Sequence, residues 1–342
     1  MTDIEISSVL DAVPMPVVYV DGDERILHAN RPAQVLLGPG IEGRHYVTIL
    51  RQPLVLDCIE AALRLNEASD AQFTDRVAGR DTVHRVRAVP VQGGVLVSFE
   101  DHTAMQEVGQ MRRDFVANVI HELRTPLTAL LGFIETLRGP ARDDEGARAR
   151  FLDIMEKEAS RMNRLVSDLL SLSRVEAEER MRPRDDVDLS AQVRTVVQSL
   201  RPFAEQNNIT VTIEGDDDPQ IIPGDADQLA QVFTNLIENA IKYGGEGGEV
   251  TICLTAHENE PTLRGPAVRV DVADRGEGIA ARHIPRLTER FYRVDGHRSR
   301  EMGGTGLGLA IVKHIVNRHR GRMRVESHKG QGTCFSVILP AR

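Results

Sequence analysis

The stretch Phe115-Val-Ala-Asn-Val-Ile-His121-Glu122-Leu-Arg-Thr125-Pro126-Leu127 decides how the middle of this chain folds. Apolar side chains recur in it, and after it, at spacings of three and four residues, which predicts one face of an amphipathic helix. That face consists of Phe115, Val119, Leu123, Leu127, Leu130, Ile134 and Leu137. At about 100° per residue, His121 falls on the opposite side of the helix, so we expect its imidazole to be exposed.

A second amphipathic helix follows the turn at Gly139-Pro140 and repeats the apolar pattern from Phe151 to Leu172. The two helices form a hairpin over residues 104–180 that cannot bury both apolar faces within one chain. A second copy of the chain would bury them in a dimeric four-helix bundle, so we expect a homodimer. Packing of the hairpin on the flanking domains is the alternative.

Composition limits the classes of protein to which the chain can belong. Its 342 residues carry a net charge of −9 and are 41% hydrophobic, which suits two or three packed domains. The acidic balance and the 4% aromatic content argue against a nucleic-acid partner. No run reaches the ~18–20 apolar residues of a membrane helix, and the N-terminus lacks the basic region of a signal peptide. We expect a cytoplasmic chain with no membrane segment, free or peripheral to the inner membrane.

The flanking regions differ in their pattern of elements. Residues 1–103 predict a small α+β module, whose order of elements resembles a PAS sensor domain. Its expected strands are Val17–Val20, Arg25–His28, His84–Val91 and Gly94–Glu100, and its expected helices are Arg31–Leu37 and Leu54–Leu65. Residues 181–190 read as a linker, and residues 188–342 predict an α/β domain. Its expected strands are Ile209–Ile213, Val250–Thr255, Val268–Ala273 and Cys334–Leu339, and its expected helices are Leu189–Asn207, Asp227–Lys242 and Gly308–Arg320.

Three residues near His121, namely Glu122, Thr125 and Pro126, favour a chemical role for this histidine over simple solvation. An exposed imidazole is partly neutral near pH 7 and can act as a nucleophile. The neighbouring Glu122 can accept its ring proton, and Thr125 lies one turn later on the same side. Pro126 lacks the backbone donor for the carbonyl of Glu122 and loosens this turn. A lone surface histidine is usually only solvated, but these neighbours indicate a reactive site.

Residues 121–127 match the H box of sensor histidine kinases, F-x-x-x-x-x-H-E-L-R-T-P-L. The resemblance implies that His121 is the phosphoacceptor and that Glu122 is the base aiding its phosphorylation. It also implies that Thr125, with Glu122, positions water for dephosphorylating the partner. Ile120 stands where many members carry serine, which changes the local polarity but no catalytic role.

A polar face marks the expected helix Asp227–Lys242. Asn235, Glu238, Asn239 and Lys242 share that face at helical spacing. Amide and carboxylate oxygens suit Mg²⁺, which fills its other positions with phosphate oxygens and water, and a lysine supplies a cation for phosphate. Asparagine is a poor residue in a helix interior, so an ordinary solvated face does not explain two of them.

Two glycine-rich segments follow. Asp274-Arg-Gly276-Glu-Gly278 comes directly after an apolar strand, and Gly303-Gly304-Thr-Gly306-Leu307-Gly308 leads into a helix. An aspartate at a strand end can accept a hydrogen bond from a base amine, and glycine-rich backbone at a helix N-terminus binds anions. Neither the Walker A pattern nor the dinucleotide-binding fingerprint fits. Between the two segments, the arginine-bearing stretch Arg293–Gly303 is predicted to be a mobile lid.

In order and spacing, these segments resemble the N, G1, F and G2 boxes of histidine-kinase ATP domains. The resemblance implies a Bergerat-type (GHKL) α/β sandwich that binds ATP with Mg²⁺. It makes Asn239 the Mg²⁺ ligand and Asp274 the residue that reads the adenine amine. The other nucleotide-binding residues that it implies are Asn235, Lys242, Tyr243, Gly276, Gly278, Gly304, Gly306, Leu307 and Gly308.

The expectation is therefore a multidomain α+β protein: a PAS-like sensor, a dimerising hairpin with the phosphoacceptor, and an ATP-binding domain. The resemblance implies a histidine kinase that passes its phosphoryl group to an aspartate of a separate response regulator. Residues 113–118 and 289–295 look most like phosphate-regulon sensor kinases, which implies a PhoB-like regulator and phosphate-starvation signalling. The alternatives are a GHKL ATPase or a PAS-driven scaffold, neither phosphorylating a histidine, and, within the same family, a net phosphatase.

Overall fold

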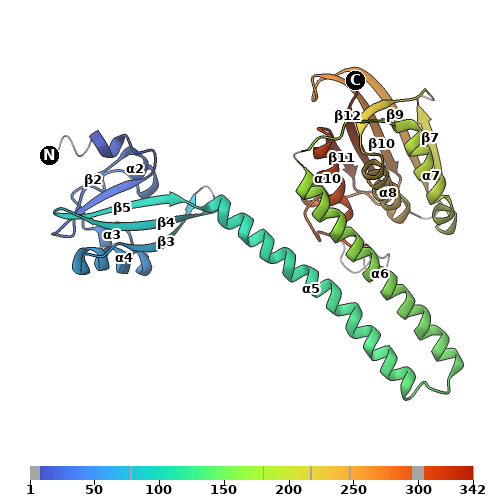
Figure 1. Cartoon of the computed structure of the whole chain (residues 1–342), viewed down its shortest axis with the longest axis horizontal. Coiled ribbons are helices and arrows are strands. Elements are labelled where there is room, and N and C mark those ends of the chain that lie inside the picture. The colour runs from blue at the N-terminus through green and yellow to red at the C-terminus, as the bar shows by residue number, and fades with distance from the viewer. Residues whose placement is uncertain are drawn as a thin grey trace. The chain divides into compact units, whose positions relative to one another are not determined.

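The computed structural model describes residues 8–77, 79–179, 181–215, 218–245, 248–294 and 304–341. The chain divides into two compact units, Met1–Ala117 and Asn118–Arg342 (Figure 1). Helix α5 (Thr103–Arg138) begins in the first unit and ends in the second. Among the described residues, no helix has both the length and the apolar character needed to cross a membrane.

The first unit is built on a five-stranded antiparallel sheet in the order β2-β1-β5-β4-β3. The strands are β1 (Val17–Asp21), β2 (Ile26–Ala29), β3 (Ser69–Val77), β4 (Arg80–Val91) and β5 (Gly94–Asp101). The helices are α2 (Arg31–Leu37), α3 (Tyr46–Ile49) and α4 (Pro53–Leu65). Gly93, at φ +89°, makes the tight turn between β4 and β5. Helix α4 packs on β3, β4 and β5.

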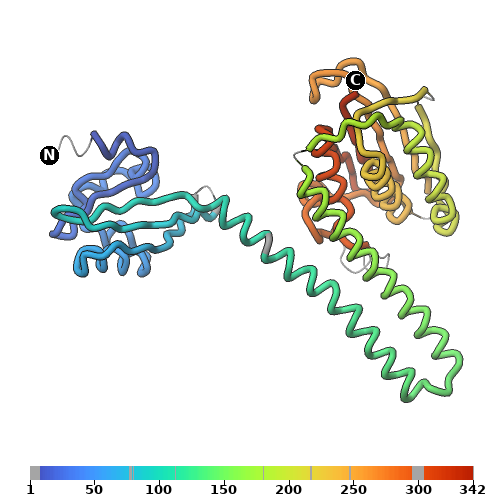
Figure 2. Tube along the Cα trace, viewed as in Figure 1, coloured from blue at the N-terminus to red at the C-terminus, as the bar shows by residue number. Residues whose placement is uncertain are grey.

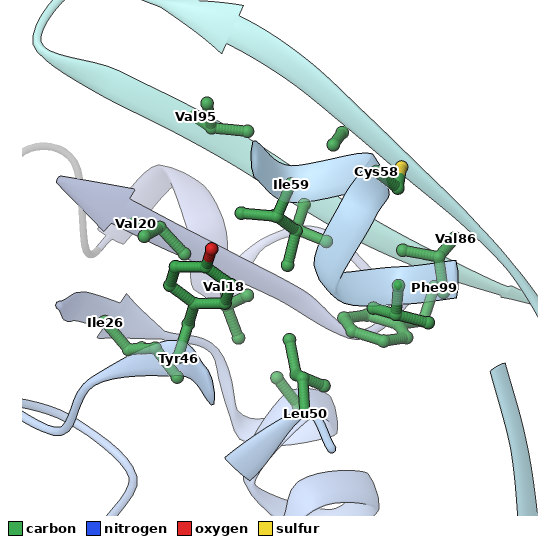
Figure 3. Close-up of a cluster of buried hydrophobic side chains, with 14 of the residues drawn as sticks. Val18, Val20, Ile26, Tyr46, Leu50, Cys58, Ile59, Val86, Val95 and Phe99 are labelled. Carbon is green, nitrogen blue, oxygen red and sulfur yellow. The ribbon is translucent and has the colours of Figure 1, made fainter. Parts of the chain in front are cut away.

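An apolar core fills the space between this sheet and its helices. Val18 and Val20 point into it from β1, and Phe99 points into it from β5, because alternate residues of a strand share one face (Figure 3). Tyr46 and Ile59 enter from α3 and α4, and both are buried. Burial also raises the pKa of the Tyr46 hydroxyl above its usual 10.0. The module is thus held together mainly by burial of aliphatic and aromatic side chains.

The second unit starts with the hairpin of α5 and α6 (Glu145–Glu178), between which the chain reverses (Figure 2). The carboxylate of Asp144 caps α6 by accepting from the backbone N–H of Ala147 at 2.8 Å. Phe133 and Phe151 stack across the hairpin with ring centroids 5.3 Å apart. Several large apolar side chains of the hairpin stay exposed: Val116, Ile120, Leu127, Leu131, Ile134, Leu152, Ile154, Val166 and Leu170.

The rest of the second unit is an α/β sandwich. Its sheet has the order β11-β12-β10-β9-β7, with β7 and β9 parallel and the other neighbours antiparallel. The strands are β7 (Thr210–Gly215), β9 (Glu249–Glu260), β10 (Gly265–Asp274), β11 (Arg322–His328) and β12 (Gly332–Pro340). Helices α7 (Leu189–Gln206), α8 (Ala226–Tyr243) and α10 (Gly308–Arg318) lie over one face of the sheet (Figure 1). The short η1 (Ile284–Arg286) follows β10.

The segment predicted as a linker is partly a strand. β6 (Asp185–Asp188) pairs with β8 (Ile221–Gly224) in a two-stranded sheet, and of its residues only Val187 is buried. We therefore propose that the C-terminal domain begins at about Asp185, before the predicted start at 188. Strands β3 and β11 also escaped prediction, because β3 carries few apolar residues and β11 alternates charged residues with half-buried ones.

Candidate functional site

His121 lies on α5 with its side chain exposed, as its helical position predicts. Thr125, one turn later, is exposed as well, and its Oγ1 donates a hydrogen bond to the carbonyl of His121 at 3.2 Å. Pro126 lies within α5 without ending the helix. The imidazole therefore stands on an unbroken helix and is open to an incoming group.

The carboxylate of Glu122 is not bonded to its neighbour His121 among the described residues. Instead its Oε2 accepts a hydrogen bond from Nη2 of Arg161, on α6, at 2.8 Å. The side chains of Arg161 and Glu122 are only 14% and 22% exposed. Sequence reasoning missed Arg161, because the helical pattern of α6 was read for its apolar residues and the pair is 39 residues apart.

The predicted polar face of α8 forms as expected, but its charges are partly paired. Nζ of Lys242 donates to Oε2 of Glu238 at 2.7 Å and lies over the ring of Phe203. Within the described chain, the side-chain amide of Asn239 makes no hydrogen bond. The amide nitrogen of Asn235 is buried and has no hydrogen-bond partner among the residues that the structure describes. A buried donor left unsatisfied is costly, so Asn235 is placed to bind an acceptor from outside the chain.

Asp274 ends β10 and is nearly buried. Its Oδ1 accepts the backbone N–H groups of Gly276 at 2.8 Å and Thr333 at 3.3 Å. Among the described residues, Oδ2 has no partner, so it can accept from a ligand. Burial raises the pKa of this carboxyl, and the two backbone hydrogen bonds partly offset that rise.

Glycines bring the predicted segments into backbone contact. A Cβ at Gly276 would lie 1.9 Å from the carbonyl oxygen of Tyr243, the last residue of α8. A Cβ at Gly308 would lie 3.0 Å from Oδ1 of Asn235. Gly276 of the predicted G1 box and Gly308 of the predicted G2 box therefore both lie against residues of the predicted N box on α8. Only a residue without a side chain allows the first approach.

The second glycine segment is shaped by its backbone. Gly306 has φ +74°, and its carbonyl accepts the N–H of Phe291 at 2.8 Å. Leu307 is buried at the start of α10, while Gly304 is half-buried. Gly278 also has a positive φ, of +66°, and packs on the carbonyl of His328. Most of the predicted lid, Arg293–Gly303, lies outside the described residues.

Helix α6 reaches this second glycine segment. Oγ1 of Thr305 donates to Oδ2 of Asp168 at 2.6 Å, and burial raises the pKa of the Asp168 carboxyl. Ser171, on the same helix, donates to Oε1 of Gln231 on α8 at 2.7 Å. Sequence reasoning missed Asp168, whose partner is 137 residues away.

Together these groups fit a purine nucleotide. A buried carboxylate with a free oxygen suits an exocyclic amine, and the unpaired amide of Asn235 suits a phosphate or ribose oxygen. The glycine segment at the start of α10 offers the backbone N–H groups of a helix N-terminus to anions. Asn239 offers an oxygen of the kind that Mg²⁺ accepts.

Comparison with known protein families finds three matches. Residues 5–72 match the PAS domain, and residues 111–178 match the His Kinase A (phospho-acceptor) domain. Residues 224–342 match the histidine kinase-, DNA gyrase B- and HSP90-like ATPase family. The three matches follow the order of domains expected from the sequence.

Curated relatives and solved structures agree with these matches. The chain is 34% identical to the phosphate regulon sensor protein PhoR of Pseudomonas aeruginosa, over 95% of this chain and 72% of that protein. It is 33% identical to the sensor histidine kinase WalK of Bacillus subtilis, over 98% of this chain but only 55% of that protein. The chain thus spans about half the length of that WalK relative.

Among solved structures, the Acinetobacter baumannii histidine kinase AdeS covers 65% of this chain at 25% identity and a TM-score of 0.50, and 98% of its own chain is matched. Histidine kinase ThkA, solved in complex with response regulator protein TrrA, covers 98% of this chain at 22% identity and a TM-score of 0.54, again with 98% of its own chain matched. The likeness to ThkA shows a shared fold.

Proposed function

This chain belongs to the sensor histidine kinases of two-component systems, and from that membership we propose that it phosphorylates its own His121 from Mg-ATP and passes the phosphoryl group to an aspartate of a response regulator. The observation that carries the proposal is the exposed imidazole of His121, followed in the chain by Glu122, in the same chain as a site whose open groups suit a nucleotide. The family match to the ATPase domain supports ATP as the phosphoryl donor.

The proposed transfer to His121 balances as follows. One ring nitrogen of His121 forms the N–P bond to the γ-phosphorus, the P–O bond to the leaving ADP breaks, and the proton on the other ring nitrogen passes to the carboxylate of Glu122. A carboxylate next to the imidazole is suited to general-base catalysis. Exposure of His121 leaves room for the nucleotide-binding domain to approach.

We assign the nucleotide contacts from the open groups of Asp274 and Asn235 and, for the other residues, from the resemblance to histidine-kinase ATP domains. Oδ2 of Asp274 accepts the adenine amine, and Tyr243 and Lys242 line the nucleotide beside Gly276 and Gly278. The buried amide of Asn235 donates to the nucleotide. The backbone of Gly304, Gly306, Leu307 and Gly308 holds the phosphates, and Asn239 holds Mg²⁺. When bound, Mg²⁺ supplies charge neutralisation on the phosphates.

The phosphoryl group then leaves His121 for a carboxylate of the regulator, which forms an acyl phosphate and restores the free imidazole. We propose that the exposed surface of α5 around His121 binds that regulator. We also propose that Thr125 and Glu122 orient a water that dephosphorylates the regulator. We further propose that these domains work in the cytoplasm, free or peripheral to the inner membrane, because the proposed reaction uses ATP and a response regulator. We also propose a PhoB-like regulator and a phosphate-starvation signal, from the 34% identity to the PhoR relative. The identity to the WalK relative is 33%, so identity alone does not separate the two.

A homodimer is supported by the apolar side chains that the hairpin leaves exposed. Leu127 and Leu131 on α5 are 50% and 56% exposed, and Leu152 and Leu170 on α6 are 52% and 57% exposed. A second hairpin would cover both faces and complete a four-helix bundle. The match to the His Kinase A domain supports the same assembly.

The test is incubation of the chain with γ-labelled Mg-ATP, beside the variants His121→Ala and Asn239→Ala. We expect label that is labile in acid and stable in alkali on the wild type alone. Adding a PhoB-like regulator should then move the label to the regulator. If ATP is hydrolysed with no label on the chain, the GHKL ATPase alternative replaces this proposal. Neither label nor hydrolysis would favour a PAS-driven scaffold.

A further inference from the structure

The ion pair between Arg161 and Glu122 joins the two helices of the hairpin beside His121. Nη2 of Arg161 lies 2.8 Å from Oε2 of Glu122, while Nη1 lies 3.8 Å from Oε2 of Glu158 on the same helix as the arginine. The short contact is therefore made to the carboxylate on the other helix. Arg161 stands between two acids and is bonded closely to the one adjacent to the phosphoacceptor.

The Arg161–Glu122 pair is more buried than an ordinary surface ion pair. Exposed pairs contribute little to stability, typically about 0–1 kcal/mol, because water screens both charges. Here both side chains are largely shielded, which strengthens a charge-assisted hydrogen bond. A guanidinium also has a planar, fixed arrangement of donors, so it restricts the direction in which a bonded carboxylate points.

The pair occupies one oxygen of Glu122 and leaves the other available. Oε2 is bonded to Arg161, and among the described residues Oε1 has no partner. A base that must take a proton from the adjacent imidazole needs a free oxygen and few competing rotamers. The contact supplies both, because it fixes the side chain while leaving Oε1 to accept the proton.

We propose that Arg161 is a positioning residue for phosphorylation of His121, acting through Glu122 and touching neither the nucleotide nor the phosphoryl group. This inference rests on the proposed kinase function. General-base catalysis contributes typically about 10²–10⁴-fold. If Glu122 is no longer held in position, part of this rate enhancement should be lost. We expect the rate of His121 phosphorylation to fall about tenfold or more.

The test compares Arg161→Gln, Arg161→Lys and a matched control, Lys157→Gln. Lys157 is an exposed cation one helical turn earlier on α6 and has no ion pair in the described structure. The readout is the rate at which labelled phosphate appears on His121 in the whole 342-residue chain at saturating Mg-ATP. We expect Arg161→Gln to slow that rate without changing the ATP concentration for half-maximal rate. Arg161→Lys should recover part of it, and Lys157→Gln should behave as the wild type.

A double-mutant cycle with Glu122→Gln separates positioning from a merely structural role. If Arg161 acts through Glu122, Arg161→Gln adds no further loss in the Glu122→Gln background. Equal fractional losses in both backgrounds would overturn the inference, as would an Arg161→Gln variant with the wild-type rate. Circular dichroism and light scattering check that each variant is folded and of the same mass. A wild type that takes no label overturns the kinase function and this inference together, whereas a labelled wild type matched by Arg161→Gln overturns this inference alone.

Discussion

Oγ1 of Thr305 donates a hydrogen bond to Oδ2 of Asp168 at 2.6 Å, which ties the proposed phosphate-binding loop to helix α6. Thr305 also accepts the N–H of Leu307 at 3.3 Å, so the same hydroxyl organises the first turn of α10. Asp168 therefore fixes the loop that, by our proposal, binds the anionic phosphates of the nucleotide. Its carboxylate brings a negative charge close to that proposed phosphate site.

Replacing Asp168 with asparagine should stabilise the chain at neutral pH. Burial raises the pKa of Asp168 above its ordinary 3.8, so the folded state binds the proton more tightly than the unfolded state. That contribution is fully present below pH 3.8 and is lost as the pH rises through the raised value. Asparagine keeps an acceptor for Thr305 without a buried charge. We expect a higher urea midpoint for Asp168→Asn at neutral pH and a smaller difference from wild type in acid.

The matched change on the other side of this bond is Thr305→Val, which leaves the half-buried Asp168 carboxylate without its donor. A buried acceptor left unsatisfied costs about 1–3 kcal/mol, so the urea midpoint should fall. Our account of the contact would be wrong if Asp168→Asn lowered the neutral midpoint as far as Thr305→Val does.

Asp274→Asn should weaken adenine nucleotide binding about ten- to hundredfold, the equivalent of losing one hydrogen bond to a charged group. Oδ1 is already engaged by two backbone N–H groups, so the new amide nitrogen would face the adenine amine, donor against donor. Titration calorimetry with ATP measures the effect. Asp271→Asn is the control, because Asp271 lies on the same strand and pairs with Arg269. Equal affinities for wild type and Asp274→Asn would refute the assignment.

His319 should make the second unit less stable in mild acid. Its Nε2 accepts the N–H of Asp225 at 3.0 Å, and its Nδ1 donates to the carbonyl of Ile315 at 2.8 Å, which requires the neutral ring. Burial lowers its pKa below 6.5, so its contribution is present above pH 6.5 and is lost as the pH falls from there through the lowered value.

Urea midpoints at about pH 7.5 and about pH 5.5 test this dependence on His319. His319→Gln should be less stable than wild type at the higher pH and should show a smaller drop between the two. The exposed His328, changed to glutamine, should retain the wild-type drop. A His319→Gln variant with an unchanged drop would assign the acid sensitivity to other groups.

We expect Arg318, on α10, to be the main residue that attaches the end of α6 to α10. Its side chain is only 9% exposed, and it contacts the carboxylates of Glu178 at 2.9 Å and Asp225 at 3.2 Å and the carbonyl of Met181 at 3.1 Å. Removing one partner of a buried ion pair costs about 3–5 kcal/mol. Arg318→Gln should therefore lower the unfolding midpoint sharply. Arg174→Gln, an exposed arginine on α6, should change it little.

Local pattern was sufficient for most elements of the fold. The sequence predicted seven of the helices: α2, α4, α5, α6, α7, α8 and α10. A helix can be predicted in this way because its apolar spacing and its end signals all lie within one short segment of the chain. The strands that escaped prediction were β3, β6, β8 and β11, which are short, at an edge, or poor in apolar residues. Pairing with a neighbour makes such segments strands, and a neighbour is not visible in a local pattern.

By itself the sequence determined which groups we propose to carry the chemistry: the exposed His121 with Glu122, the polar face of α8, and the two glycine segments. Motif residues are close in the chain, so helical geometry and glycine content suffice to predict their relation. Only the tertiary structure decided that Arg161 holds Glu122 and that Asp168 holds Thr305. These contacts join residues 39 and 137 positions apart, and they form only because α5, α6 and the α/β sandwich pack against one another.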